Sequence, residues 1–363
     1  MTAISRRNLL ATLASGACAA CVPLAALDGQ TVAPSLIALN ANENPYGPSP
    51  AALAAARQAA SRGAYYDFSS RSAFRQAVAD GEDLTLENVV LSTGSNEALC
   101  AAVAAWGKQG HILAPQLTYS AHLNYARRVG VDVQTIPLNP SMAIDLEAMA
   151  AAVNQDTALV YLCNPNNPTG LPLNTQQLQT FCETVGKNTT ILLDEAYIEL
   201  SADPRGSSMV KLIQSDTNII VTRTFSKVYG LAGMRVGYAM ARSDLAKKLS
   251  DHVMSWTSHI SVAAAMASYG DQAFIALSQQ QIAAGRKIVA DTYARHGINT
   301  LPSSTNFVFA DLGRDAAAFA SAMKDRGILI NGNYSGFPTW SRVSMGRLEH
   351  LQIFSKVFDE VFS

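Results

Sequence analysis

The residue types most suited to chemistry lie in one block of the chain, which runs from Arg223 to Tyr238. Lys227 follows an apolar run with the character of a buried strand, and its neighbours are small or hydroxylated. A lysine whose pKa is lowered by desolvation is a nucleophile that forms a Schiff base with an aldehyde. Thr224, Ser226 and Arg235 add two hydroxyls and a planar guanidinium, which together suit a phosphate group. The block therefore indicates pyridoxal phosphate as a ligand, and an ordinary charged surface loop is the alternative.

Three more strand ends carry polar residues of the same character. Proline and glycine in 164–170 fix a turn after an apolar run and display Asn167 at the strand's carboxyl end, where open α/β sheets bind ligands. Asp194 ends another apolar run, and a carboxylate buried there needs a partner such as a protonated pyridine nitrogen. Gly94 lies in a strand–turn–helix junction, where a new helix offers N–H groups to an anion. The ordered set favours one ligand site far more than any single motif does.

Side chains from such distant segments need a scaffold, and the hydrophobic pattern predicts one. Between residues 51 and 241, short β-branched runs alternate with alanine-rich helical stretches. This alternation is typical of an α/β fold with a mostly parallel sheet and helices on both faces. The expected strands are 89–91, 111–113, 132–136, 158–163, 190–193, 218–221 and 235–239.

The later part of the chain predicts a smaller α+β domain. A long helical stretch, 271–296, has one polar face, and a final helix is expected from residue 348. Strands are expected at 306–310, 328–330 and 342–344. The expected organisation is a leader (1–26), an N-terminal arm (27–50), a large cofactor-binding domain (51–245) and a small C-terminal domain (246–363).

The composition favours an enzyme with a large core. Of 363 residues, 48% are hydrophobic and 15% are charged, and the formal net charge of −1 gives no reason to expect nucleic acid or an anionic membrane as partner. Cys100, Cys163 and Cys182 are the cysteines beyond the leader, and their scattered positions do not form a disulfide framework. The histidines show no metal-binding spacing, so no metal is expected.

With these motifs the chain resembles the fold-type I pyridoxal-phosphate aminotransferases of class I/II, and most of all the histidinol-phosphate aminotransferase group. The resemblance covers nearly everything after the leader. It implies an aspartate aminotransferase-like fold and a homodimer. The matching segments are 39–47, the Gly94 turn, 164–170, 194–197, 224–238, 306–307 and 342–346.

The resemblance also implies a role for each matching residue near the cofactor ring. Lys227 would bind the cofactor covalently and later move the proton at the substrate's α carbon. Asp194 would keep the pyridine nitrogen protonated. Asn167 and Tyr197 would hydrogen-bond the ring's phenolic oxygen, and Tyr119 would stack on the ring face.

The implied phosphate and substrate contacts come from other segments. The phosphate would be held by the backbone at Ser95 and Asn96 together with Thr224, Ser226 and Arg235. Tyr65 would reach the phosphate of the neighbouring subunit, which makes the active sites of the dimer shared. Arg342 would grip the substrate carboxylate bidentately, and Asn44 and Tyr46 would also contact the substrate.

The expected reaction is ping-pong transfer of an amino group between an amino acid, or histidinol phosphate, and a 2-oxo acid. Decarboxylation, cyclisation or oxidation of an amino acid would use the same cofactor residues and is the alternative. Three departures from the group bear on the donor. Tyr66 and Asp67 follow Tyr65 where proline is common, and residues 254–259 replace a stretch that usually carries proline, asparagine and serine near the substrate pocket. After Gly346 the chain continues with Arg-Leu-Glu, where Thr-Arg-Glu or Thr-Pro-Glu is usual.

The first 26 residues have the layout of a secretory signal. Arg6 and Arg7 precede an alanine-rich apolar stretch that small residues and Pro23 make a poor membrane span. The arginine pair resembles the twin-arginine signal, which exports folded proteins with their cofactor bound. A periplasmic or otherwise exported enzyme is therefore expected, with cleavage near Ala25 or Ala26. The alternative is an amphipathic extension on a cytoplasmic enzyme.

Overall fold

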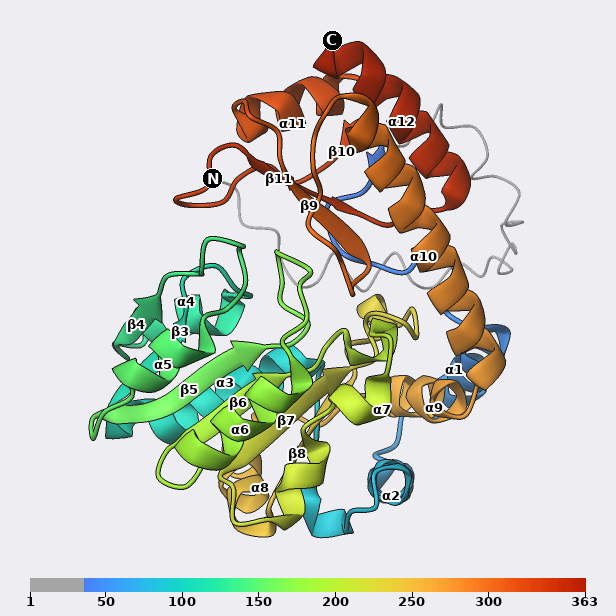
Figure 1. Cartoon of the computed structure of the whole chain (residues 1–363). Helices are drawn as coiled ribbons and strands as arrows, with labels where there is room; N and C mark the ends of the chain where they lie inside the picture. The colour runs from blue at the N-terminus through green and yellow to red at the C-terminus, as the bar shows by residue number, and fades with distance from the viewer. Residues whose placement is uncertain (1–35) are drawn as a thin grey trace, which may run out of the picture. The chain divides into compact units, whose positions relative to one another are not determined.

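The computed structural model describes residues 36–363, and a seven-stranded sheet organises much of this range (Figure 1). The strand order is β2-β8-β7-β6-β5-β3-β4. β8 runs antiparallel to both of its neighbours, and every other pair is parallel. The α/β class with a mostly parallel sheet is thereby confirmed. The strands are β2 (Val89–Ser92), β3 (His111–Pro115), β4 (Val133–Ile136), β5 (Thr157–Cys163), β6 (Thr190–Asp194), β7 (Ile219–Thr224) and β8 (Gly237–Ala241).

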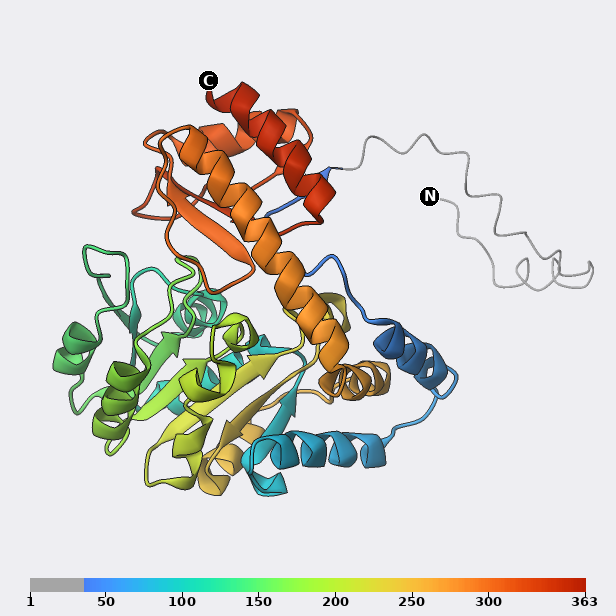
Figure 2. The same cartoon turned by 45° about the vertical axis from the view of Figure 1, so that its right-hand side comes forward.

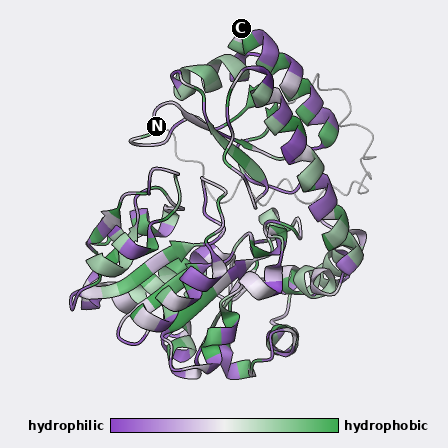
Figure 3. Ribbon diagram, viewed as in Figure 1, coloured by the Kyte–Doolittle hydropathy of each residue, from purple (hydrophilic) through white to green (hydrophobic). Residues whose placement is uncertain are grey.

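The sheet is buried on both faces because side chains alternate between two cores. In β5, Leu159, Tyr161 and Cys163 pack into the core on one face, and Val160 and Leu162 pack into the core on the other. Period-two alternation with apolar residues on both sides is what a sheet covered by two helical layers requires. Figure 3 shows the resulting hydrophobic strands in green.

The helices around this sheet begin and end where the local sequence allows. Ser49, Asp67, Asp145, Asn174 and Asp271 each cap a helix by accepting a hydrogen bond from a backbone N–H of its first turn. The helices are α1 (Pro50–Ala60), α2 (Phe68–Gly81), α3 (Ser95–Trp106), α4 (Ala121–Arg128), α5 (Leu146–Ala152), α6 (Thr175–Val185), α7 (Pro204–Ser207), α8 (Ser243–Ser250), α9 (His259–Tyr269), α10 (Gln272–Arg295), α11 (Ala316–Asp325) and α12 (Leu348–Phe362).

Two short sheets accompany helices α10, α11 and α12 in the later part of the chain. β9 (Phe307–Asp311) pairs antiparallel with β11 (Trp340–Ser344), and β10 (Ile328–Leu329) pairs parallel with β1 (Ile37–Ala38). β1 belongs to the expected N-terminal arm, so this arm completes a sheet of the C-terminal part. α9 packs against α1, as both views show (Figures 1 and 2). The expected domain boundary at residue 245 stays a prediction.

One predicted strand begins later than the sequence pattern indicates. The apolar run predicts a strand from residue 235, but β8 begins at Gly237. Arg235 has a left-handed backbone with a φ of 53°, which ends strand geometry at that residue. Arg235 therefore belongs to the turn before β8 and not to the strand.

The expected signal segment, residues 1–26, lies outside the described residues. Within residues 36–363, no single helix combines the length and hydropathy needed to cross a bilayer; α9 and α10 meet that test only as a pair bent by 83°. The same residues contain no cluster of three or more histidine, cysteine or acidic side chains placed to hold a metal ion.

Candidate active site

The sheet topology brings the polar strand ends to one edge. β3, β5, β6 and β7 are parallel, and β2 has the same direction because β8 lies antiparallel between β2 and β7. The carboxyl ends of these five strands therefore meet at the edge where β8 begins. Ligands of open α/β sheets bind at this edge.

A cavity of about 100 Å³ lies there, and predicted cofactor residues line it. Tyr65 is the one predicted cofactor residue that does not line the cavity, and Ala196 lines it without having been predicted. The lining residues are Ser95, Asn96, Tyr119, Asn167, Asp194, Ala196, Tyr197, Thr224, Ser226, Lys227 and Arg235.

Lys227 follows the end of β7 and is positioned by the N-terminal segment. Its Nζ donates to the backbone oxygen of Asn42 at 3.1 Å and lies 5.4 Å from the centre of the Tyr197 ring. Burial, and after it the positive charge of Arg342, lowers the pKa of Lys227 to about 8, while Asp194 opposes the shift. A substantial fraction of the amine is therefore neutral, and hence nucleophilic, near pH 8.

Asp194 ends β6 and is buried, with 3% of its surface exposed. Thr222, its register partner on β7, donates a hydrogen bond from Oγ1 to Asp194 Oδ1 at 2.9 Å. Burial raises the pKa of Asp194 to about 6, and the Thr222 bond and the charge of Lys227 oppose this rise. At neutral pH the carboxylate is still mainly ionised, so a cation placed against it in the cavity is stabilised.

Tyr197 and Arg342 are both hydrogen-bonded to Asn167. The Tyr197 hydroxyl accepts hydrogen bonds from Asn167 Nδ2 at 3.2 Å and from Asn42 Nδ2 at 3.1 Å. Arg342, on β11, donates from Nη1 to Asn167 Oδ1 at 2.7 Å and from Nη2 to the backbone oxygen of Asn40 at 2.9 Å. Its Nε is buried without a partner in the described part of the chain.

The opposite end of the cavity is suited to an anion. α3 begins at Ser95, directly after Gly94, whose φ of 77° is a conformation that glycine adopts without strain. A side chain at Gly94 would also collide with the Arg235 guanidinium, since a Cβ there would lie 2.5 Å from Nη2. Thr224 donates to Ser226 Oγ at 2.9 Å, and Arg235 Nη1 lies 3.4 Å from the same oxygen. Free helix N–H groups, hydroxyls and a guanidinium together form a phosphate cradle.

These residues fit pyridoxal phosphate. The Gly94 turn leaves the cradle open for a phosphate, and the buried Asp194 carboxylate suits a protonated pyridine nitrogen at the other end. Tyr119 follows β3, and its hydroxyl lies 3.3 Å from Asn96 Oδ1, so that its ring forms one wall of the cavity. When bound, the cofactor supplies an electron sink for negative charge at the substrate's α carbon.

Four predicted residues do not line the cavity, namely Arg342, which contacts the lining residue Asn167, and Tyr65, Asn44 and Tyr46. Tyr65 is 72% exposed. Asn44 is buried, and its Nδ2 donates to the Val228 backbone oxygen at 2.8 Å and to Ser278 Oγ at 2.9 Å, so these polar contacts stabilise the fold. The Tyr46 hydroxyl accepts from the backbone N–H of Leu348 at the start of α12. The substrate contacts of Asn44 and Tyr46 stay predictions.

Sequence reasoning missed Asn42 and Thr222. Asn42 contacts both Lys227 and Tyr197, and it accepts from Ser344 Oγ at 2.6 Å. Its φ of 53° is a left-handed conformation that asparagine tolerates better than most residues, so the asparagine-rich run was the available signal. Thr222 could have been found by counting two residues back from Thr224, because alternate strand residues share a face.

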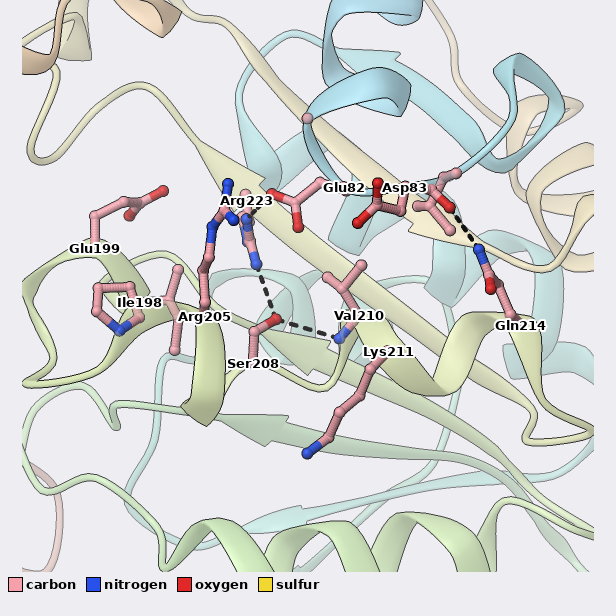
Figure 4. A pocket seen from close by; sticks show the side chains of 13 residues that line it. Glu82, Asp83, Ile198, Glu199, Arg205, Ser208, Val210, Lys211, Gln214 and Arg223 are labelled. Carbon is pink, nitrogen blue, oxygen red and sulfur yellow. Dashed lines mark hydrogen bonds and ion pairs between the residues drawn. The ribbon is translucent and has the colours of Figure 1, made fainter.

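A larger hollow of about 360 Å³, shown in Figure 4, contains none of the predicted cofactor residues. Arg223 lies at its centre and donates to Glu195 Oε2 at 3.0 Å and to Ser208 Oγ at 2.8 Å, and it also pairs with Glu82. Its charge is therefore already compensated. These contacts hold the end of β7 in place next to Thr224. The hollow therefore contains a structural network that stabilises the phosphate cradle.

Comparison with known proteins agrees with this geometry. A sequence model of the family described as aminotransferase class I and II matches residues 34–357. A histidinol-phosphate aminotransferase of Brevibacillus brevis is 34% identical over 331 residues, which are 90% of this chain and 90% of that one.

Solved structures show the same likeness. The histidinol-phosphate aminotransferase of Sinorhizobium meliloti, in complex with pyridoxal-5'-phosphate, superposes with a TM-score of 0.82 and 30% identity, covering 95% of this chain and 98% of that one. An aspartate aminotransferase of Thermus thermophilus has a TM-score of 0.78 at 19% identity, covering 90% and 96% of the two chains, and shows a likeness of fold alone.

Proposed function

Because this chain belongs to the class I and II aminotransferases and uses pyridoxal phosphate, we propose that it transfers the amino group of histidinol phosphate to a 2-oxo acid. The donor is proposed from the relatives that are at least 30% identical over most of both chains. The acceptor is proposed from the site itself, where Arg342 offers a guanidinium to a carboxylate. The two half-reactions would use the same cavity in turn.

The proposal that a 2-oxo acid accepts the amino group rests on Arg342. It is buried beside Asn167, its charge depresses the pKa of Lys227, and no acidic residue forms an ion pair with it in residues 36–363. A buried guanidinium without a carboxylate partner is costly, and a substrate carboxylate would compensate that cost with charge-assisted hydrogen bonds. The carboxylate would then place the oxo carbon beside Lys227.

The chain's own groups have separate tasks in the transfer. Lys227 Nζ is close to half neutral at pH 8 and can act as a base. It would move the proton between the substrate's α carbon and the cofactor. Asp194 holds positive charge at the far end of the cavity. Asn167 and Tyr197 orient the ring oxygen by hydrogen bonding, and Arg342 orients the substrate.

Replacing Arg342 with lysine is expected to raise the KM for the 2-oxo acid by about 10-fold or more, because the forked, bidentate contact is lost while the charge stays. The measurement is a panel of donors, including histidinol phosphate, against 2-oxoglutarate and pyruvate, monitored by the cofactor's absorbance. Arg326→Lys is the matched control, since Arg326 pairs with Glu360 on the surface. Equal KM values in the two variants would reject the role of Arg342, and turnover with other donors but not histidinol phosphate would reject the proposed donor.

We also propose a homodimer with shared active sites. Tyr65 supports it, because its ring is mostly exposed and does not line the cavity of its own chain. Mixing Lys227→Ala subunits with Tyr65→Phe subunits should recover activity above either parent, since one site of each mixed dimer then carries neither change. The control is each variant mixed with itself under the same exchange conditions. A fully active monomer in sedimentation would contradict the shared site.

Export by the twin-arginine route is proposed from Arg6 and Arg7 alone. Changing both to lysine should retain the protein in the cytoplasm and leave its activity intact, because the residues that line the catalytic cavity are unchanged. Fractionation and the mass of the mature protein are the measurements. Continued export of the double variant, or a full-length native protein in the cytoplasm, would contradict the proposal.

A further inference from the structure

We propose that Asn306 is a positioning residue that acts on Lys227 through Asn42. Asn306 lies directly before β9 and is completely buried. Its Nδ2 donates to the backbone oxygens of Asn42 at 2.8 Å and of Glu43 at 3.0 Å. The Asn42 oxygen is also the atom to which Lys227 Nζ donates at 3.1 Å. Because Lys227 is the base and attachment residue of the proposed function, this role of Asn306 rests on that function.

Every polar atom of Asn42 is hydrogen-bonded. Its backbone N–H donates to Ser344 Oγ at 2.9 Å, and the same hydroxyl donates to Asn42 Oδ1 at 2.6 Å. Its Nδ2 donates to the Tyr197 hydroxyl at 3.1 Å. The left-handed backbone of Asn42, with a φ of 53°, costs energy and persists only where the surroundings hold it. The contacts from β11 and from Asn306 therefore fix the direction of the Asn42 oxygen, which faces Lys227.

The amide of Asn306 is not explained by stability alone. Its Oδ1 is buried and has no hydrogen-bond partner among residues 36–363, and a buried acceptor without a donor is destabilising. Turning the amide over would place Oδ1 against two carbonyl oxygens, so donation from Nδ2 fixes its orientation. Asn306 thus keeps an unpaired oxygen in order to hold two backbone carbonyl groups, one of which is the acceptor of Lys227.

The two donors that share the Asn42 oxygen have different tasks. Lys227 Nζ has to leave this oxygen when it binds the cofactor or moves a proton. Asn306 Nδ2 stays and keeps Asn42 in place while the amine has another partner. Phe307 adds a contact from the same segment, since its ring meets the Tyr197 ring edge-on with a centroid separation of 5.4 Å. The two residues before and at the start of β9 therefore support both the acceptor of Lys227 and the ring of Tyr197.

The contact with Asn42 has a defined effect on the Lys227 amine. A protonated amine donates more strongly to a carbonyl oxygen than a neutral amine does, so this contact raises the pKa of Lys227. Burial is the main cause that lowers this pKa to about 8; nearby cations act in the same direction and nearby carboxylates oppose it. The charged groups that act on the amine are Arg342, Asp194, Glu43 and Arg235. Releasing the Asn42 oxygen removes none of them and should lower the pKa further.

The test is the rate at which the cofactor-free, full-length chain captures pyridoxal phosphate, measured by stopped-flow absorbance across the neutral and alkaline pH range. Asn306→Leu removes the amide and nearly keeps the side-chain volume. The pH at which the rate levels off should fall by about one pH unit, because a hydrogen bond to a charged group is lost. Ser344→Ala should shift it in the same direction by a smaller amount, since Asn42 keeps its contact with Asn306.

Thr292→Val is the matched control for a purely structural effect. Thr292 is fully buried on α10, and its hydroxyl lies 2.8 Å from both the Ile288 backbone oxygen and Ser355 Oγ. The residue does not line the cofactor cavity. The change should therefore lower the unfolding temperature and leave the pH profile of cofactor capture at its native position.

The proposal is overturned if folded Asn306→Leu keeps the native pH profile, or if Thr292→Val shifts the profile equally. If Asn306→Leu does not fold, Ser344→Ala decides alone, and an unchanged profile in that variant overturns the proposal. Failure of the proposed function has a different signature, because borohydride would then fix the cofactor of the native enzyme on a peptide that lacks Lys227.

Discussion

Lys227→Ala is expected to abolish the covalent attachment of the cofactor and to lower turnover by at least ~10²–10⁴-fold, the usual contribution of a positioned acid–base group. The reason is the position of Nζ, which is held at the cavity by Asn42 and next to the Tyr197 ring. The native enzyme should absorb in the visible, and borohydride reduction should fix the cofactor on the peptide that contains Lys227. The variant should lack both signals.

Two exposed lysines provide matched controls for this variant. Lys211 and Lys247 lie on the surface, and Lys247 pairs with Asp251. Lys211→Ala and Lys247→Ala should keep the visible absorbance and normal turnover. A labelled peptide centred on either of these residues would show that the attachment site has been assigned wrongly.

The pKa of Lys227, which burial lowers to about 8, sets the pH dependence of the same attachment in the native protein. Only the neutral amine attacks an aldehyde, so the rate at which cofactor-free protein captures pyridoxal phosphate should level off above pH 8. Below that pH the rate should fall about 10-fold per unit, because the neutral fraction falls by that factor. Stopped-flow absorbance measures this rate. A profile that still rises steeply to pH 10 would show an unshifted lysine.

Asp194→Asn is expected to retain the cofactor but to lower turnover by more than ~100-fold. An amide cannot stabilise a protonated pyridine nitrogen, and a lost charge-assisted hydrogen bond costs about 1.5–3 kcal/mol before any effect on the transition state is added. The cradle formed by the Gly94 turn and Arg235 is unchanged, so cofactor retention should persist. Steady-state turnover and cofactor content, measured on the same sample, separate the two effects.

Thr222→Val is the graded control for Asp194→Asn. It removes the 2.9 Å hydrogen bond to Asp194 Oδ1 and leaves the carboxylate in place. A neutral donor is worth about 0.5–1.5 kcal/mol, so turnover should fall by only about 2- to 10-fold. If Asp194→Asn were no more damaging than Thr222→Val, another group would have to hold the positive charge.

Much of the scaffold follows from local patterns. The seven strands of the central sheet lie within a few residues of the runs that predict them. Most of these strands are buried along nearly their whole length, and such strands are largely apolar; the edge strand β4 is only partly buried. The long helix α10 and the final helix α12 follow from helical spacing in the same way. Arg235 is an exception to this agreement. The sequence pattern predicts a strand from residue 235, but the left-handed backbone of Arg235 delays the start of β8 to Gly237.

The cavity follows from the sequence only in part, and the division has a physical reason. Lys227, Asp194 and Asn167 stand directly after apolar strands, and parallel strands bring their carboxyl ends to one edge, so sequence order alone places these residues together. Asn42 and Arg342 contact residues that line the cavity. Pairing between segments about 300 residues apart brings them there, as in the contacts of Arg342 with Asn40 and of Ser344 with Asn42. No local pattern encodes such a pairing, because its register is decided by how the N-terminal segment and β11 pack. The sequence thus determined which functional residues lie at the ends of strands. The tertiary structure decided which residues from distant segments contact them.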